Sequence, residues 1–163
     1  MVYQNHMGEW MNKEEWSKNV IIVSGGFDRV HKGHMRMFRE AANLGANVVV
    51  GLNSDEWLTR KKGKPFMGWD ERAEILECCK FVNQVLPMDD SDDTASDIIF
   101  KVCKLYNNED FNIYFANGGD RKKGNVPELD VCKYLGVVML WGIGGGKIQS
   151  SSDLTTNWES DND

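Results

Sequence analysis

Short apolar runs alternate along the chain with segments in which apolar residues recur at helical spacing. The runs are rich in Val and Ile and have the length of buried strands. We expect five strands, at residues 20–23, 48–52, 83–86, 112–116 and 137–141. Helical spacing between them predicts stripes of core-facing residues. The stripe residues are Met35, Phe38 and Ala42, then Ala73, Ile75 and Leu76, and then Ile98, Ile99, Val102 and Leu105.

This alternation of strand and helix predicts an α/β fold. Parallel strands joined by right-handed helical crossovers form a doubly wound, Rossmann-like sheet of five strands with helices on both faces. Ligands bind such sheets outside the carboxyl ends of the strands, at the point where the strand order reverses. Three polar segments should converge there, because they follow the first, fourth and fifth expected strands. They are residues 25–28, 118–120 and 150–152.

Composition narrows the classes of protein that the chain can belong to. A chain of 163 residues is large enough for one domain with a real core. Its net charge of −6 argues against a nucleic-acid-binding protein, and the chain has no apolar run of membrane-spanning length. We therefore expect a cytoplasmic protein that binds small molecules, with reduced cysteines, including the adjacent Cys78 and Cys79 inside a helix. The expected organisation is an N-terminal extension (1–18), one domain (19–155) and an acidic tail (156–163).

The segment after the first expected strand carries the strongest chemical signal. Gly25, Gly26, Phe27 and Asp28 form a turn, and His31 and His34 follow where a helix should begin. A glycine turn allows close backbone approach, and a helix N-terminus attracts anions, so this segment predicts a phosphate site. A metal pair is an alternative, but no third ligand accompanies the histidines. A second alternative is that both histidines have purely structural roles at the start of a helix.

Asp28 is open to three interpretations. Its carboxylate could contact an acceptor, orient a histidine or close the turn, and aspartate is common in turns for that last reason. The basic run of residues 60–64 is likewise either a solvated surface loop or a segment that closes on a substrate.

The motifs together resemble those of the nucleotidylyltransferase superfamily. The histidine segment is similar to its His-x-Gly-His signature, in the branch of the glycerol-3-phosphate cytidylyltransferases and heptose-1-phosphate adenylyltransferases. The resemblance covers roughly residues 19 to 155 and keeps the order of the motifs. The family's arginine upstream of its Ser-Thr-Thr block is not evident, and residues 144–147 occupy that stretch. The matching blocks are Asn53-Ser54-Asp55, Lys62-Gly63-Lys64-Pro65, Glu71-Arg72, Asn117-Gly118-Gly119-Asp120 and Ser150-Ser151-Ser152.

The resemblance implies a role for each block. His31 and His34 would bind the α- and β-phosphates of a nucleoside triphosphate, and Lys62 and Lys64, on a mobile loop, would reach the α-phosphate and the attacking phosphate. Ser150, Ser151 and Ser152 would bind the outer phosphates. The base and ribose would lie against Gly118, Gly119 and Asp120, with Arg121 adding positive charge. Arg72 matches a family arginine, although a helix-surface ion pair is the alternative. Mg²⁺ would accompany the triphosphate, and the family suggests a homodimer.

The expected reaction joins a nucleoside monophosphate to a small phosphorylated metabolite with release of pyrophosphate. The block at 117–120 favours a sugar 1-phosphate as acceptor, with ATP as the first choice of donor and CTP as the second. Two alternatives remain open. One is an adenylyltransferase acting on a cofactor precursor such as flavin mononucleotide, and the other is a nucleotide-binding regulatory module without turnover.

Overall fold

A computed structural model describes residues 2–4, 10–12, 18–106, 109–118 and 126–144 of the chain. Its centre is the predicted parallel sheet of five strands, and their order is β5-β4-β3-β6-β7. Each expected strand is present, with ends that differ by at most two residues from the expected bounds. The strands are β3 (Asn19–Gly25), β4 (Ala46–Leu52), β5 (Gln84–Pro87), β6 (Asn112–Gly118) and β7 (Val138–Ile143).

The sheet grows outward from β3, its central strand. The chain first adds β4 and β5 on one side and then crosses to add β6 and β7 on the other. Ile21 pairs with Val48 of β4 and with Tyr114 of β6, so β3 is hydrogen-bonded on both edges. The strand order therefore reverses between β3 and β6, which is where ligands bind in sheets of this kind.

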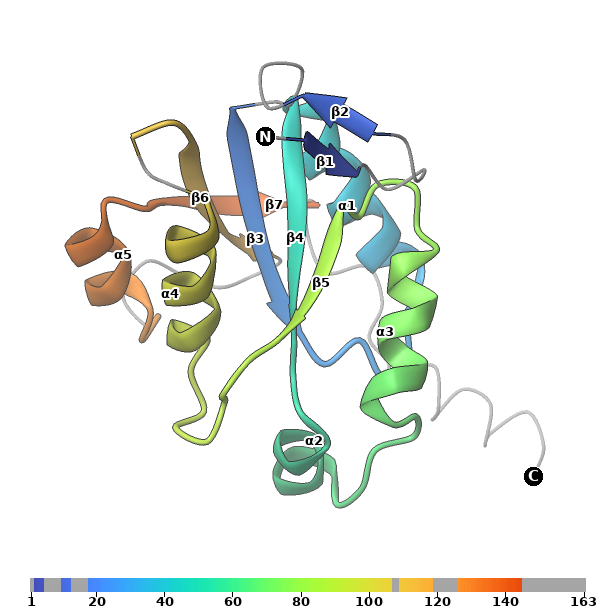
Figure 1. The fold of residues 1–163 in the computed structure, drawn as a ribbon. Helices are drawn as coiled ribbons and strands as arrows, with labels where there is room; N and C mark the ends of the chain where they lie inside the picture. Colours follow the sequence, from blue (N-terminus) through green and yellow to red (C-terminus); the bar gives the residue numbers. More distant parts are fainter. Residues whose placement is uncertain (1, 5–9, 13–17, 107–108, 119–125, 145–163) are drawn as a thin grey trace.

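Helices cover both faces of the sheet (Figure 1). Helices α1 (Lys32–Asn43) and α3 (Trp69–Glu77) pack on one face, where Phe38 and Leu76 are fully buried. Helices α4 (Ser96–Leu105) and α5 (Leu129–Leu135) pack on the other. Helix α2 (Asp55–Lys62) lies beyond the carboxyl end of β4 and covers neither face (Figure 1). The doubly wound architecture predicted from the sequence is confirmed.

Two stripe residues and one helix boundary differ from the sequence prediction. Ile75 is 43% exposed and Leu105 is 61% exposed, although both were expected in the core. In α3, Ala73 and Leu76 are one helical turn apart and both face the sheet, so Ile75 between them faces away. Helix α3 also ends at Glu77, which places Cys78 at its cap and Cys79 beyond it rather than inside the helix.

Gly51 shows how closely α4 approaches the sheet. A Cβ atom at this position would lie 2.7 Å from the Cγ1 atom of Ile98. Any larger residue would therefore push α4 away from β4, because packed interiors leave no room for an added methyl group. Gly51 thus keeps the helix in contact with β4 at this point of the core.

Near the N-terminus, β1 (Val2–Gln4) and β2 (Trp10–Asn12) form a separate antiparallel pair. The boundary expected at residue 18 stays a prediction, and the acidic tail lies outside the described residues. No helix in the described part of the chain combines the length and apolar character that crossing a membrane requires.

Candidate active site

Two histidines cap helix α1 immediately after the turn that follows β3. The Nδ1 atom of His31 accepts a hydrogen bond from the Gly33 N–H at 3.1 Å, and Nδ1 of His34 accepts one from the His31 N–H at 3.2 Å. Their rings stack with centroids 3.7 Å apart and planes 21° apart. The helix begins at Lys32, between the two histidines. Both imidazoles are thereby fixed in orientation by the backbone.

The capping bonds determine where each neutral imidazole carries its proton. A ring nitrogen that accepts a hydrogen bond is not protonated, so the proton of a neutral His31 or His34 is on Nε2. The expected structural role and the expected ligand role therefore use different atoms. Nδ1 caps the helix, whereas Nε2–H is a hydrogen-bond donor of the kind that an anionic oxygen requires.

His34 remains uncharged in the free protein at neutral pH. Its pKa is lowered from 6.5 to about 4, first because the ring is buried and then because His31 and Lys62 are close and positively charged when protonated. Part of the burial comes from Phe27, whose ring contacts His34 edge-on at a centroid distance of 4.8 Å. Phe27 is itself 5% exposed, so its ring supports His34 from within the core.

Lys62 approaches this turn from helix α2. Its Nζ atom donates a hydrogen bond to the Asp28 carbonyl oxygen at 2.9 Å. The expectation of a loop lysine is wrong, because Lys62 is the last residue of α2 and Gly63, with a φ of 91°, ends that helix. Lys64 lies on the exposed segment that follows. We call residues 25–34, which contain the glycine turn, His31 and His34, the histidine turn. Of the two expected lysines, Lys62 is therefore the one that the structure brings to the histidine turn.

The Asp28 carboxylate binds the backbone of the segment after the lysines. Its Oδ2 accepts from the Phe66 N–H at 2.7 Å, and its Oδ1 accepts from the Met67 N–H at 2.9 Å. Asp28 is 5% exposed. The turn-closing interpretation is wrong, because the residues that the carboxylate holds lie far along the sequence, whereas contact with an acceptor stays a prediction. Its expected place among the nucleotide-binding residues stays a prediction.

Arg72 is buried at the base of the same site. The alternative of a helix-surface ion pair is wrong, because its side chain is completely inaccessible and its guanidinium is surrounded by acceptors. The acceptors lie in the turns after β3 and β4, in the first turn of α2 and in the segment before α3. They are Gly26 O at 2.8 Å, Asn53 O at 2.9 Å, Met67 O at 2.9 Å and Asp55 Oδ1 at 2.7 Å.

We expect Arg72→Met to lower the free energy of unfolding by about 3–5 kcal/mol, the usual cost of removing one partner from a buried ionic network. Methionine fills much of the volume but leaves the carbonyl oxygens without their donor. Urea denaturation measures the change. Arg36→Met, which alters an exposed arginine on α1, should leave the unfolding free energy within about 0.5 kcal/mol of the wild type. Equal midpoints for both variants would contradict the structural role of Arg72.

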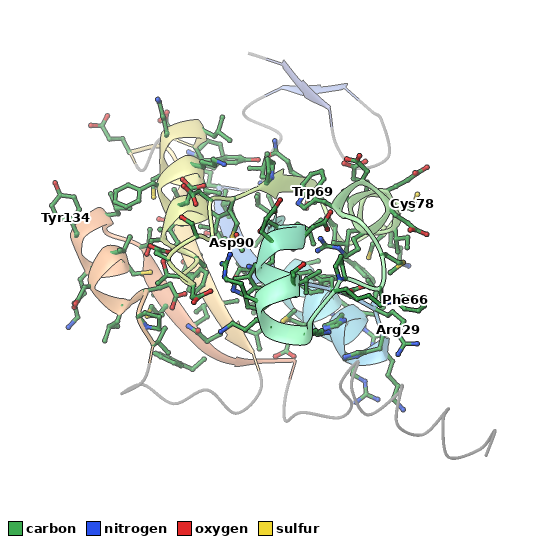
Figure 2. The ribbon with its side chains drawn as sticks, turned by 90° about the horizontal axis from the view of Figure 1, so that it is seen from below. Arg29, Phe66, Trp69, Cys78, Asp90 and Tyr134 are labelled. Carbon is green, nitrogen blue, oxygen red and sulfur yellow. The ribbon has the colours of Figure 1, made fainter. Side chains whose placement is uncertain are left out.

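Asp90 is a further site residue that sequence reasoning missed. Its carboxylate accepts hydrogen bonds from Asn53 Nδ2 at 2.9 Å, from the Ser54 N–H at 2.8 Å and from Ser54 Oγ at 2.7 Å. Burial alone would raise the pKa of Asp90, but the hydrogen bonds to its carboxylate together outweigh burial and lower the pKa below its usual value. Figure 2 places Asp90 beside α2, whose N-cap is Ser54. The Asn53-Ser54-Asp55 block was recognised in the sequence, but nothing in it indicated that Asp90 accepts its hydrogen bonds.

Gly26 of the first turn is close to α2, and Gly25 is close to the Phe27 ring. A Cβ atom on Gly26 would lie 2.9 Å from Leu58 Cδ2, and one on Gly25 would lie 3.1 Å from the Phe27 ring. Gly118 ends β6. The other expected nucleotide-binding residues lie outside the described residues. They are Gly119, Asp120, Arg121, Ser150, Ser151 and Ser152.

The sequence matches the model of one protein family over most of this fold. Residues 22–133 match the cytidylyltransferase-like family. The match covers more than half of the chain and includes the histidine turn, Lys62 and Arg72. The chain therefore belongs to the cytidylyltransferase-like family, whose members are nucleotidyltransferases.

Individual relatives agree with this assignment. The chain is 30% identical over 130 residues to the glycerol-3-phosphate cytidylyltransferase of Bacillus subtilis, covering 79% of this chain and 93% of the relative. It is 37% identical over 91 residues to the bifunctional protein HldE of Campylobacter concisus, covering 55% of this chain but 19% of that protein. The crystal structure of a lipopolysaccharide core biosynthesis protein from Thermoplasma volcanium superposes with a TM-score of 0.56 at 21% identity, covering 76% of this chain and 93% of that one. This last similarity supports the fold.

Proposed function

We propose that the chain is a nucleotidyltransferase that joins a nucleoside monophosphate, from ATP or CTP, to a small phosphorylated metabolite. A phosphate oxygen of the acceptor forms a bond to the α-phosphorus of the triphosphate. The bond between that phosphorus and the oxygen bridging to the β-phosphate breaks, and pyrophosphate leaves with the electron pair. The transfer is neither an oxidation nor a reduction and needs no covalent enzyme intermediate, so positioning and fixed positive charge supply most of the catalysis.

The histidine pair carries the proposal. His31 and His34 are held in stacked orientation by backbone hydrogen bonds to their Nδ1 atoms. The Nε2–H groups can then donate to phosphate oxygens as negative charge develops on the leaving group, and they do so without rearrangement. The N-terminus of α1 adds the positive end of a helix dipole at the same place.

Lys62 would add a full positive charge. Its Nζ atom already lies 2.9 Å from the Asp28 carbonyl, in the same turn as the histidines. A flexible lysine stem allows the ammonium group to exchange this carbonyl for a phosphate oxygen when the substrate binds. Lys64, Ser150, Ser151, Ser152 and Arg121 are proposed to contact the remaining phosphates, as the family resemblance implies.

Mg²⁺ is proposed to enter with the triphosphate. The described residues contain no group of three or more His, Cys, Asp or Glu side chains able to enclose a metal ion. Mg²⁺ usually keeps several waters and binds substrate phosphates, so it needs no dedicated cage of protein side chains. When bound, Mg²⁺ would neutralise part of the triphosphate charge, and His31, His34 and Lys62 would supply the positive and donor groups of the chain itself.

Two acceptor classes each have an observation in their favour. The Asn-Gly-Gly-Asp block at residues 117–120 favours a sugar 1-phosphate, as expected from the sequence. The similarity to a glycerol-3-phosphate cytidylyltransferase over 93% of that protein favours a polyol phosphate with CTP as the donor. A homodimer stays part of the proposal as the family's expected assembly.

Pyrophosphate release tests the proposal directly. The purified chain should release pyrophosphate with Mg²⁺, one of the four common nucleoside triphosphates and one acceptor from a panel of sugar phosphates, polyol phosphates and flavin mononucleotide. We expect turnover with ATP or CTP and a sugar or polyol phosphate. Consumption of flavin mononucleotide alone would replace the acceptor class. Triphosphate binding by calorimetry without turnover on any acceptor would instead favour a regulatory module.

A further inference from the structure

Asp28 contacts both ends of the segment that carries the lysines. Its backbone carbonyl accepts from Lys62 Nζ at 2.9 Å, and its carboxylate accepts from the N–H groups of Phe66 and Met67 at 2.7 and 2.9 Å. One residue of the histidine turn therefore holds residues 62–67 at two points. The carboxylate is buried, so these bonds form with little competition from water.

Two arginines reinforce the same attachment. The Nε atom of Arg72 donates to the Met67 carbonyl at 2.9 Å, so the Met67 residue is held through both its N–H and its C=O. The Arg29 guanidinium lies 4.7 Å from the centre of the Phe66 ring. Figure 2 shows Arg29 and Phe66 side by side at one edge of the molecule. The backbone of residues 66 and 67 is thus held by hydrogen bonds to Asp28 and Arg72, and the Phe66 ring by a cation–π contact with Arg29.

Electrostatics limits what the Asp28 carboxylate can do at a triphosphate site. A carboxylate facing a triphosphate would repel it, since like charges a few ångströms apart destabilise each other even at high effective dielectric. Here each carboxylate oxygen is instead directed at a backbone N–H group. The group therefore serves the protein's own segment rather than the polyanionic substrate.

We propose that Asp28 is a positioning residue for nucleotidyl transfer, which holds residues 62–67 against the histidine turn so that Lys62 is aligned with the phosphates. This inference rests on the proposed function, because it concerns the same site. It assigns Asp28 an action through Lys62 instead of contact with the nucleotide. A misplacement of about 1 Å at a reacting group can lower the rate by about 100-fold, so such a residue affects turnover strongly.

A double-mutant cycle in the full-length chain tests this dependence. Asp28→Ala should lower kcat by about 10- to 100-fold, with a change of less than about threefold in the KM for the triphosphate. If Asp28 acts through Lys62, adding Asp28→Ala to Lys62→Ala should lower kcat little further. Multiplicative losses in the double variant, or a large rise in KM for Asp28→Ala alone, would overturn the proposal.

Limited proteolysis measures the attachment without using activity. Trypsin cleaves after Arg60, Lys61 and Lys62, whereas the Lys64–Pro65 bond resists it. Cleavage after Lys62, the bond that lies within residues 62–67, should be about tenfold faster in Asp28→Ala than in the wild type, because opening of the segment precedes cleavage. Asp130→Ala, at an exposed position of α5, should match the wild type. Unchanged cleavage in a folded Asp28→Ala protein would refute the proposal.

Two further controls distinguish an unfolded variant, or an inactive wild type, from a failure of the proposed role of Asp28. If circular dichroism shows Asp28→Ala to be unfolded, Asp28→Asn replaces it. This variant keeps the size of the side chain and turns one acceptor into a donor that opposes a backbone N–H, so the same kinetic and proteolytic changes are expected. If the wild type released no pyrophosphate, the proposed function would fail, whereas the proteolysis would still decide whether Asp28 holds residues 62–67.

Discussion

Replacing Lys62 by alanine should lower kcat by about 100- to 1,000-fold, the usual loss when one preorganised positive group of a transition state is removed. The physical reason is that Lys62 supplies a full charge at the turn where His31 and His34 lie, and its Nζ is already 2.9 Å from the Asp28 carbonyl. A steady-state assay of pyrophosphate release measures kcat. The KM for the triphosphate should change much less, because an interaction formed mainly in the transition state affects turnover more than binding.

Neighbouring lysines provide matched controls for this experiment. Lys61 is exposed, and its Nζ atom lies 5.7 Å from the centre of the Trp57 ring. Lys61→Ala should therefore keep kcat within about twofold, because its ammonium group lies over this ring, whereas that of Lys62 binds the Asp28 carbonyl oxygen. Lys64→Ala is expected to fall between the two variants. Near-normal turnover of folded Lys62→Ala would show that its contact with Asp28 is structural only.

Replacing His34 should also lower kcat by about 100- to 1,000-fold, and two amide variants separate its two nitrogen atoms. In His34→Asn, the side-chain oxygen can replace Nδ1 as the acceptor for the His31 N–H, but nothing replaces the Nε2–H donor. In His34→Gln, the amide nitrogen reaches farther and can replace Nε2–H, but the cap is lost. We expect His34→Asn to be stable and nearly inactive, and His34→Gln to be less stable and more active.

Stability against pH checks the state of the His34 ring. Its pKa is about 4 in the folded protein and near 6.5 when unfolded. Between these values the unfolded chain binds the extra proton, so the free energy of unfolding of the wild type should fall as the pH decreases from 6.5 to 4. This component is absent from His34→Asn, whose unfolding by urea should depend less on pH in that range. Equal pH dependence, or greater activity of the Asn variant than of the Gln variant, would contradict the assigned roles.

The fold could be predicted from the sequence because hydrophobic periodicity is a local signal. Buried strands such as Ala46–Leu52 are continuous apolar runs, and their alternation with helices leaves few topologies. The histidine turn was recognisable for a related reason, since glycines and histidines occur together within ten consecutive residues. What the pattern did not show was the face on which a single residue lies. Ile75 and Leu105 are apolar and helical, yet exposed.

The supporting contacts could not be predicted, because they join residues that are distant along the chain. Arg72 bonds to Gly26, and Asp90 bonds to Ser54. A charged residue in a helical segment is usually solvated, and nothing in the local sequence distinguishes one that becomes buried in a ring of carbonyl oxygens. Such partners become evident only when the topology brings the turns after β3, β4 and β5 to one edge of the sheet.

The strand order has a consequence for how the two halves of the sheet are distributed along the chain. The chain completes β3, β4 and β5 before it passes the exposed residues 91–93, and it forms β6 and β7 afterwards. His31, Lys62 and Arg72 all precede that passage. The β3–β6 ladder, from the Asn19–Asn112 pair to the Ile22–Phe115 pair, joins the two stretches within the sheet. Exchanging the stretch after residue 93 between relatives would therefore transplant the half of the sheet that begins with β6 while leaving the histidines, the lysine and their buried arginine in place.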